Sequence, residues 1–327
     1  MSLLHFGWNR APACAASLPT EGLFKTAHVT LKTVLLTIGA AAPERPKWLR
    51  APAPVGQNYR ELKNLIADLK LHTVCESAAC PNVGECWNHR TATFMILGNV
   101  CTRRCGFCAV QKGGPLAVDY DEPRRVAEAV AVMGLRYAVV TSVNRDDRKD
   151  GGAELFALTI EAIRERISDC KVEVLVPDFQ GNRAAMKMVM DARPDVLNHN
   201  TETVPRLYRQ VRLGARYERS LEMLQYAKEL RPETPVKSGL MLGLGEMREE
   251  VLEVMRDLHT HRVDILTLGQ YLRPSPKHLP IVRYVPPVEF DEYRRAGAEM
   301  GFAHVEAGPL VRSSYHADES HNAASVC

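Results

Sequence analysis

The sequence predicts an α/β fold built on a parallel sheet, and two observations lead to this class. Six short apolar segments rich in β-branched residues recur along the chain, as is typical of strands buried on both faces. Segments of helical period separate them, so each strand is followed by a helix and neighbouring strands run parallel. Six units are too few for a complete eight-stranded barrel, so a partial barrel and an open doubly wound sheet both remain.

The elements follow in order. After an arm rich in proline, residues 59–71 repeat apolar side chains at helical spacing. A loop rich in cysteine comes next, and the regular alternation begins after it. The predicted strands are Thr93–Gly98, Tyr137–Val143, Val172–Val176, Val196–Asn200, Val236–Leu242 and Ile265–Leu268. The predicted helices are Glu122–Met133, Ala153–Ile167, Arg183–Ala192, Ser220–Leu230, Glu246–His259 and Glu289–Met300.

The two ends of the chain differ from this body. Residues 1–44 are poor in acids, and their apolar run 34–38 is too short to span a bilayer. An acid-poor start is compatible with a signal peptide or an organellar presequence. Clustered cysteines suit a reducing interior, so we expect a dispensable, disordered extension and a cytoplasmic protein. We divide the rest into an arm, helix and cysteine loop (45–92), the βα body (93–302) and a C-terminal segment (303–327).

Charge and cysteine content narrow the function. The 327 residues include 42 Lys and Arg against 39 Asp and Glu, and aromatic residues make up only 6%. This composition predicts neither a nucleic-acid partner nor a membrane surface. Six of the nine cysteines fall between Cys75 and Cys108. An odd, clustered set in a long chain argues against a disulfide framework and favours a metal site.

Cys101, Cys105 and Cys108 form a CxxxCxxC motif directly after the first strand of the alternation. In parallel α/β proteins the loops at the carboxyl ends of the strands carry the ligand site. Three closely spaced thiolates can hold three corners of a cubane cluster and leave the fourth iron open to a substrate. A structural zinc loop is the alternative, but zinc sites use paired CxxC motifs or add histidine. The spacing therefore favours a 4Fe–4S cluster with one open iron.

Cys75, Cys80 and Cys86 form a second triplet upstream of the sheet. Their CxxxxCxxxxxC spacing matches no two-cluster ferredoxin pattern. It satisfies neither disulfide pairing nor the periodicity of a packed face. A second metal site at this triplet needs a fourth ligand from elsewhere in the chain, or it too stays open.

These motifs resemble known families. The first triplet, with the aromatic Phe107 before its last cysteine, is similar to the signature of the radical S-adenosylmethionine superfamily. Both triplets in this order, with the C-terminal segment Arg312–Asp318, resemble the lipoyl synthase family and its Arg-Ser-Ser-Tyr motif. The resemblance implies that Ser314 is the fourth ligand of an auxiliary cluster, with Ser313 as the near alternative. It also implies a partial parallel (β/α)6 barrel whose terminal extensions carry the auxiliary ligands.

The resemblance further implies a sulfurtransferase that uses two 4Fe–4S clusters and S-adenosylmethionine. Its reaction inserts two sulfur atoms at carbons 6 and 8 of an octanoyl chain on a lysine of a carrier domain, which belongs to lipoate biosynthesis. One cluster cleaves S-adenosylmethionine and the auxiliary cluster donates sulfur, with no catalytic side chain beyond the cluster ligands. Radical chemistry is needed because an unactivated C–H bond offers no acidic proton to a general base.

The implied partners are octanoylated lipoyl-carrier domains, namely E2 subunits of 2-oxoacid dehydrogenases and the H protein of glycine cleavage. A low-potential donor such as flavodoxin or ferredoxin would supply electrons. Two other hypotheses stay open. One is a biotin-synthase-like sulfur transferase, whose sulfur-donating cluster has ligands inside the barrel. The other is a non-enzymatic iron–sulfur or zinc scaffold.

Two weaker motifs follow other predicted strands. Gly151 and Gly152 open a helix, where backbone N–H groups would meet the methionine end of S-adenosylmethionine, as a glycine-rich motif does in the superfamily. A simple turn with a helix cap is the alternative. Glu202 follows the fourth strand and is a candidate for the ribose or amine of the cofactor. Polar residues at the end of a strand are also often only solvated.

Other polar residues receive structural interpretations. Residues 144–147 are interpreted as a solvated charge cluster, His199 as a packed side chain, and Cys170 as an ordinary buried thiol. The segment Gly243–Glu246 lacks the third glycine of a dinucleotide fingerprint.

Overall fold

The sheet contains the six predicted strands and extends beyond them at both edges. The computed structural model describes residues 44–51, 54–78, 80–88 and 91–324, all within the second of the chain's two units, Ala42–Cys327. The strands are β1 (His72–Thr73), β2 (Thr93–Ile96), β5 (Tyr137–Ser142), β6 (Lys171–Leu175), β7 (Val196–Asn198), β8 (Val236–Leu242), β9 (Ile265–Gln270) and β10 (His304–Gly308). They are ordered β1-β2-β5-β6-β7-β8-β9-β10, and every pair is parallel except β1 with β2. A separate pair, β3 (Val100–Cys101) with β4 (Gln111–Lys112), lies in the cysteine loop.

The edge strand β10 is not among the predicted strands. It pairs in parallel with β9, from His304 opposite Ile265 to Gly308 opposite Gly269. Its sequence HVEAG contains only two apolar residues, and only these two are buried. A short strand that alternates in this way has no continuous apolar run, which is the signal that identified the other parallel strands.

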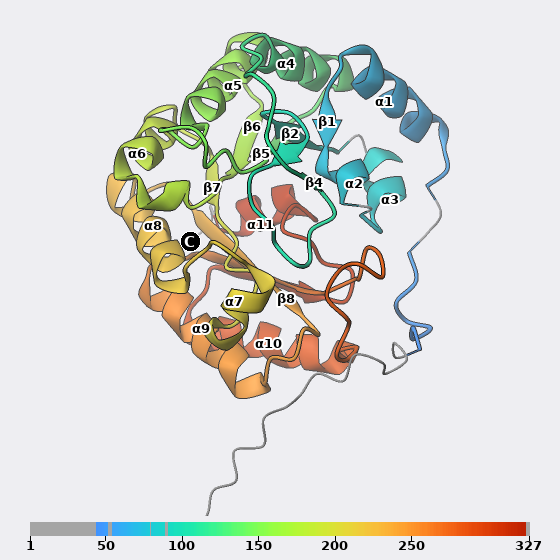
Figure 1. Ribbon diagram of the computed structural model, residues 1–327, viewed down its shortest axis with the longest axis vertical. Coiled ribbons are helices and arrows are strands. Elements are labelled where there is room, and N and C mark those ends of the chain that lie inside the picture. The colour runs from blue at the N-terminus through green and yellow to red at the C-terminus, as the bar shows by residue number, and fades with distance from the viewer. Residues whose placement is uncertain (1–43, 52–53, 79, 89–90, 325–327) are drawn as a thin grey trace, which may run out of the picture. The chain divides into compact units, whose positions relative to one another are not determined.

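The helices that follow the strands form one layer on the outer face of the sheet. They are α4 (Glu122–Met133), α5 (Ala153–Arg166), α6 (Arg183–Asp191), α8 (Tyr217–Leu230), α9 (Arg248–Thr260) and α10 (Pro287–Met300). In Figure 1 these six helices follow one another around the outside of the strands. A doubly wound sheet would carry helices on both faces. The arrangement therefore agrees with a partial barrel.

Local sequence fixes the ends of these helices. Asn182 caps α6, because its side-chain oxygen accepts hydrogen bonds from the backbone N–H groups of Ala184 at 3.0 Å and Ala185 at 3.2 Å. Gly134 ends α4 in the left-handed conformation, with φ of 63°. No helix in the described ranges is long and apolar enough to cross a membrane.

The terminal extensions meet at the open side of the sheet. The N-terminal one forms α1 (Gln57–Asp68), α2 (Val74–Ser77) and α3 (Val83–Asn88). The C-terminal one leaves β10, turns at residues 308–311 and ends in α11 (Ala317–Ala324), which contacts β5 and β10. Two short helices, η1 (Phe179–Gly181) and η2 (Pro205–Leu207), and α7 (Tyr208–Val211) complete the elements. In Figure 1, α11 lies inside the ring of outer helices.

Candidate active site

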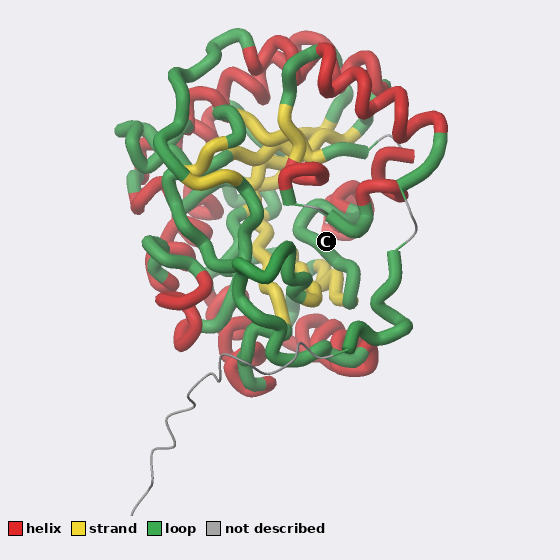
Figure 2. The backbone as a smooth tube through the Cα atoms, turned by 45° about the vertical axis from the view of Figure 1, so that its right-hand side comes forward, coloured by secondary structure: helices red, strands yellow, loops and turns green. Residues whose placement is uncertain are grey.

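The loop with Cys101, Cys105 and Cys108 lies at the carboxyl ends of the strands, held by three other loops. The backbone N–H of Thr102 donates to the Asn144 carbonyl oxygen, after β5, at 3.1 Å. Gly106 donates to the Val211 carbonyl oxygen at 2.9 Å and accepts from the Leu279 N–H at 3.1 Å. Figure 2 shows long loop segments, in green, between the strands and the helices. The cysteine loop is therefore fixed by residues that follow β5, β7 and β9.

A buried charge network anchors the same loop. The Arg103 guanidinium binds Asp146 at 2.7 Å and Asp178 at 2.5 Å, and Arg219 binds Asp178 at 2.7 Å. Burial alone would raise the pKa of Asp178, but the hydrogen bond and charge of Arg103 hold this pKa well below its usual range. The carboxylate stays ionised, so it can fix the arginine that lies between Cys101 and Cys105.

The three thiols are partly buried. The backbone N–H of Asn144 donates to Cys101 Sγ at 3.3 Å. Burial raises the pKa of Cys108 to about 11 and also raises that of Cys105, which the charge of Arg212 opposes. Binding to iron must therefore displace protons from these thiols. The interpretation of residues 144–147 as a solvated charge cluster is wrong in part, because Arg145 is buried and Asp146 binds the buried Arg103 at 2.7 Å.

The structure brings Glu202 near this loop. Glu202 follows β7 in a left-handed conformation, with φ of 68°, and forms a parallel bridge with Leu240 of β8. Its carboxylate accepts a hydrogen bond from Asn200 Nδ2 at 3.1 Å. Burial raises its pKa, which the positive charge of Arg212 opposes, and its charge acts on Cys105 and Cys108. A bulky residue held at positive φ is strained, which marks a position where the side-chain direction matters.

Gly151 and Gly152 have a packing role. Their φ values are 59° and 92°, which favours glycine. A Cβ on Gly152 would lie 2.2 Å from Leu97 Cδ1, and one on Gly151 would lie 2.9 Å from Phe179 Cδ1. The N–H of Gly151 already donates to the Arg148 carbonyl oxygen at 3.2 Å. These contacts support the simple turn with a helix cap.

The second triplet surrounds one pocket. Cys75 lies in α2, Cys86 lies in α3, and Cys80 lies between them. Burial, together with the charge of other thiols of the triplet, raises the pKa of Cys75 to about 11 and that of Cys86 to about 12. Thiols that shift one another's pKa values lie near each other.

The C-terminal segment completes this pocket. Ser314, Arg312 and Tyr315 line it together with the three cysteines and Thr93. Thr93 Oγ1 donates to Ser314 Oγ at 2.8 Å, and Tyr315 Oη donates to Glu85 at 3.1 Å. Ser313 is not among the residues that line the pocket. Ser314 therefore reaches the second triplet from the far end of the sequence.

In the described part of the chain, the thiols of the second triplet are not arranged around one common point as the ligands of a single metal ion would be. No three His, Cys, Asp or Glu side chains in the described part of the chain could hold one ion. Three sulfurs around one zinc would be roughly 3.8 Å apart, given a Zn–S bond of about 2.3 Å and tetrahedral geometry. A cubane cluster separates its ligands further, because each thiolate binds a different iron.

Two polar side chains, Trp87 and Arg312, act on the thiols of this triplet. Trp87 is fully buried and packs on Tyr59 with ring centroids 5.1 Å apart, yet its Nε1 has no hydrogen-bond partner of standard geometry. Burial raises the pKa of the Cys75 thiol, and the Trp87 N–H opposes that rise. Burial likewise raises the pKa of Cys80, and the charge of Arg312 opposes it. Thiols with an N–H donor and a cation beside them suit an anionic occupant.

Some of these residues were outside the sequence predictions. Arg103, Trp87 and Arg312 were not singled out, although each lies within or beside a recognised motif. The other interpretations agree with the structure: His199 is buried between the Val176 carbonyl oxygen at 2.8 Å and Ser220 Oγ at 3.0 Å, and Cys170 is buried.

Comparison with known proteins places these motifs in a family. Residues 95–258 match the model of the radical SAM superfamily, and residues 29–80 match that of the N-terminal domain of lipoyl synthase. A lipoyl synthase of Koribacter versatilis is 64% identical over 278 residues, which cover 85% of this chain and 91% of that protein. A lipoyl synthase of Rubrobacter xylanophilus is 64% identical over 275 residues, covering 84% of this chain and 86% of that protein. One from Thermus thermophilus is 56% identical over 297 residues, covering 89% and 92%.

Solved structures share the fold. Methylornithine synthase has a TM-score of 0.51 and 13% sequence identity, over 75% of this chain and 71% of that chain. HydG, a maturase of the FeFe-hydrogenase, has a TM-score of 0.51 and 16% identity, over 64% of this chain and 49% of that one.

Proposed function

Because this chain belongs to the lipoyl synthase family of radical S-adenosylmethionine enzymes, we propose that its two cysteine triplets hold the two 4Fe–4S clusters that the family's reaction requires. The enzyme is a sulfurtransferase of lipoate biosynthesis, which inserts sulfur into a protein-bound octanoyl chain at carbons 6 and 8. The two triplets have separate roles, since they lie on different segments and share no ligand.

Cys101, Cys105 and Cys108 would hold the cluster that binds S-adenosylmethionine. When bound, the clusters supply electron transfer to S-adenosylmethionine and sulfur for the product. The protein's own residues fix the loop, through Arg103 with its two aspartates and through the backbone of Gly106. With three thiolates in the motif, one iron has no protein ligand from it and is free to bind the cofactor.

Cys75, Cys80, Cys86 and Ser314 would hold the auxiliary cluster. The observation that carries this assignment is that Ser314 lines the same pocket as the three cysteines although it follows them by more than 200 residues. Thr93 fixes the serine hydroxyl at 2.8 Å. An alkoxide binds iron less strongly than thiolate does, so this ligand is suited to be released when sulfur leaves.

Charge and hydrogen bonding support the same occupant. Three thiolates make the site negative, the Arg312 cation lines the pocket, and the Trp87 N–H interacts with the Cys75 thiol from outside the lining. Hydrogen bonds to the sulfurs and nearby charge are known means of tuning such clusters.

For S-adenosylmethionine we assign Glu202, Gly151 and Gly152 as contacts. Glu202 has the stronger support, because its carboxylate lies within the electrostatic reach of Cys105 and Cys108 and its backbone is held in a strained conformation. The glycines are also explained by their packing on Leu97 and Phe179. Any contact with the methionine end of S-adenosylmethionine would have to be made by the whole turn that contains these glycines.

The enzyme acts on protein-bound octanoyl substrates. We propose that these are lipoyl-carrier domains of 2-oxoacid dehydrogenase E2 subunits and of the glycine cleavage H protein. Flavodoxin or ferredoxin would donate the electrons, and the cytoplasm would be the compartment. Residues 1–44 would be dispensable, although the family match begins at residue 29 within that stretch.

The deciding experiment combines a metal count with a product assay. Anaerobically reconstituted protein should hold about eight irons, four in each of two clusters. It should also convert an octanoylated carrier peptide to its dithiolated form, as measured by mass spectrometry. Cys105→Ala should abolish 5′-deoxyadenosine release. Fewer irons with a 2Fe–2S spectrum would favour a biotin-synthase-like enzyme, and bound zinc without turnover would favour a scaffold.

A further inference from the structure

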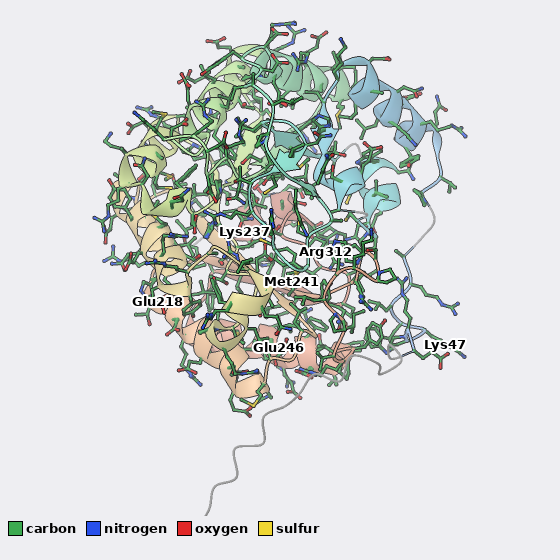
Figure 3. The ribbon with its side chains drawn as sticks, viewed as in Figure 1. Lys47, Glu218, Lys237, Met241, Glu246 and Arg312 are labelled. Atoms are coloured by element: carbon green, nitrogen blue, oxygen red, sulfur yellow. The ribbon has the colours of Figure 1, made fainter. Side chains whose placement is uncertain are left out.

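Arg312 enters the barrel where the C-terminal segment turns inward after β10, and it lines the auxiliary pocket. The chain fits there because Gly269 of β9 has no side chain. A Cβ on Gly269 would lie 2.1 Å from the Val311 carbonyl oxygen and 3.3 Å from Arg312 Nη1. Figure 3 labels Arg312 and Met241 in the middle of the view, and Met241 of β8 pairs with Gly269 of β9. The sheet therefore leaves room for this side chain.

The Arg312 guanidinium has no carboxylate partner within the described ranges. Arg312 Nη1 donates to the Val311 carbonyl oxygen at 2.6 Å, and the charges that act on it come from Cys80 and Glu202. Burial lowers the pKa of Arg312, and these two charges oppose the shift. Arg103 and Arg219, by contrast, are both paired with Asp178. Arg312 is half-buried and has no ion-pair partner among the described residues, so negative charge held in the pocket would stabilise its guanidinium.

Glu202 extends this series of interacting charges from Arg312 toward the triplet Cys101, Cys105 and Cys108. Its charge interacts with Arg312 on one side and with Arg212 on the other, and Arg212 in turn acts on Cys105. Arg212 is held in place by hydrogen bonds from Nη1 to the Asn200 carbonyl oxygen at 2.8 Å and to Tyr208 Oη at 3.1 Å. When iron binding has ionised Cys80 and Cys105, charges of opposite sign alternate between them in the order Cys80, Arg312, Glu202, Arg212 and Cys105.

We propose that Arg312 is a positioning residue whose charge holds the auxiliary cluster in its pocket and raises the reduction potential of that cluster. The inference rests on the proposed assignment of Cys75, Cys80, Cys86 and Ser314 as ligands. The cluster and its thiolates together are negative, so a nearby cation stabilises them. The reduced state carries one more negative charge than the oxidised state, so the same cation favours reduction.

The test compares Arg312→Gln with Arg312→Lys in the full-length, reconstituted protein. Ser313→Ala, a change in the next residue that does not line the pocket, is the matched control. Arg312→Gln should still assemble both clusters, but the auxiliary cluster should have a more negative midpoint potential in a redox titration followed by electron paramagnetic resonance. It should also lose iron to a chelator about tenfold faster, because a charge-assisted interaction contributes at least 1.4 kcal/mol, which is about tenfold. Arg312→Lys keeps the charge and should stay near the wild-type potential.

In the metal-free, full-length chain, Arg312→Gln should have the opposite effect and stabilise the protein. There the arginine has no anion to offset it, so Arg312→Gln should raise the melting temperature while it weakens retention of the cluster. A lower melting temperature in both the metal-free and the reconstituted forms would mean that Arg312 acts through packing, and the inference would be wrong.

The outcomes separate this inference from the proposed function. If wild-type protein holds about eight irons and Arg312→Gln matches it in potential and in iron release, only the role of Arg312 is wrong. If Arg312→Lys and Arg312→Gln change the potential equally, charge is not the cause and the inference again fails. If wild-type protein holds only about four irons, the auxiliary assignment and the inference fail together.

Discussion

Asp178→Asn tests how the cysteine loop is held at the carboxyl ends of the strands. Asp178 accepts hydrogen bonds from Arg103 at 2.5 Å and from Arg219, and its side chain is fully buried. Asparagine keeps the shape but removes the charge that offsets two guanidinium groups. Removing one partner of a buried ion pair costs about 3–5 kcal/mol. Because Arg103 keeps Asp146 at 2.7 Å, we expect a loss of about 3 kcal/mol in the free energy of unfolding.

The assay combines denaturant unfolding with 5′-deoxyadenosine release. A displaced Arg103 would misplace the two cysteines on either side of it, so release of 5′-deoxyadenosine should fall at least tenfold. Asp195→Asn is the matched control, because Asp195 also binds two cations, Arg164 at 2.9 Å and Lys171 at 3.1 Å, but with exposed partners. It should cost about 1 kcal/mol or less for the ion pairs and leave cleavage unchanged.

The pH dependence gives a second check with a definite sign. The pKa of Asp178 in the folded protein lies below its value in the unfolded chain, so its contribution is fully present above about pH 4 and is lost as the pH falls through the folded pKa. The stability difference between wild type and Asp178→Asn should therefore be constant above about pH 4 and shrink below it. A variant with wild-type stability and wild-type cleavage at neutral pH would refute the anchoring role.

The other predictions concern the ligands and the ends of the chain. Cys80→Ala should still release 5′-deoxyadenosine and abstract hydrogen from the octanoyl chain but insert no sulfur, measured as nucleoside by chromatography and thiolated peptide by mass; lipoyl product from this variant would contradict the auxiliary site as sulfur source. Ser314→Ala should assemble both clusters yet slow sulfur transfer at least tenfold, whereas Ser313→Ala should behave as wild type. If Ser313→Ala slows sulfur transfer and Ser314→Ala does not, Ser313 is the ligand. Glu202→Gln should weaken S-adenosylmethionine binding about tenfold or more, the worth of a charge-assisted hydrogen bond, and unchanged binding in a titration would remove it from the site. Deleting residues 1–44 should leave iron content and turnover intact, and a truncated protein that loses a cluster would show that this stretch is needed.

The local pattern of the sequence determined most of the fold. The six strands and the helices between them follow from apolar runs and helical periodicity, which depend only on near neighbours in the chain. The edge strand β10 was missed because HVEAG has two apolar residues and gains its place by pairing with β9. Both cysteine triplets could be proposed as cluster sites from the sequence, since the cysteines of each triplet are close together along the chain.

Tertiary structure decided which distant residues complete each site. The choice between Ser313 and Ser314 depends on which hydroxyl faces the pocket after the C-terminal segment turns into the barrel, where Thr93 binds Ser314. Asp178 is assigned to the cysteine loop only because the strand order places the ends of β5 and β6 beside it. The local periodicity of the sequence does not predict pairings between residues this far apart in the chain. They arise when parallel strands bring their carboxyl ends to one edge of the sheet, and buried charges are stable there only next to their partners.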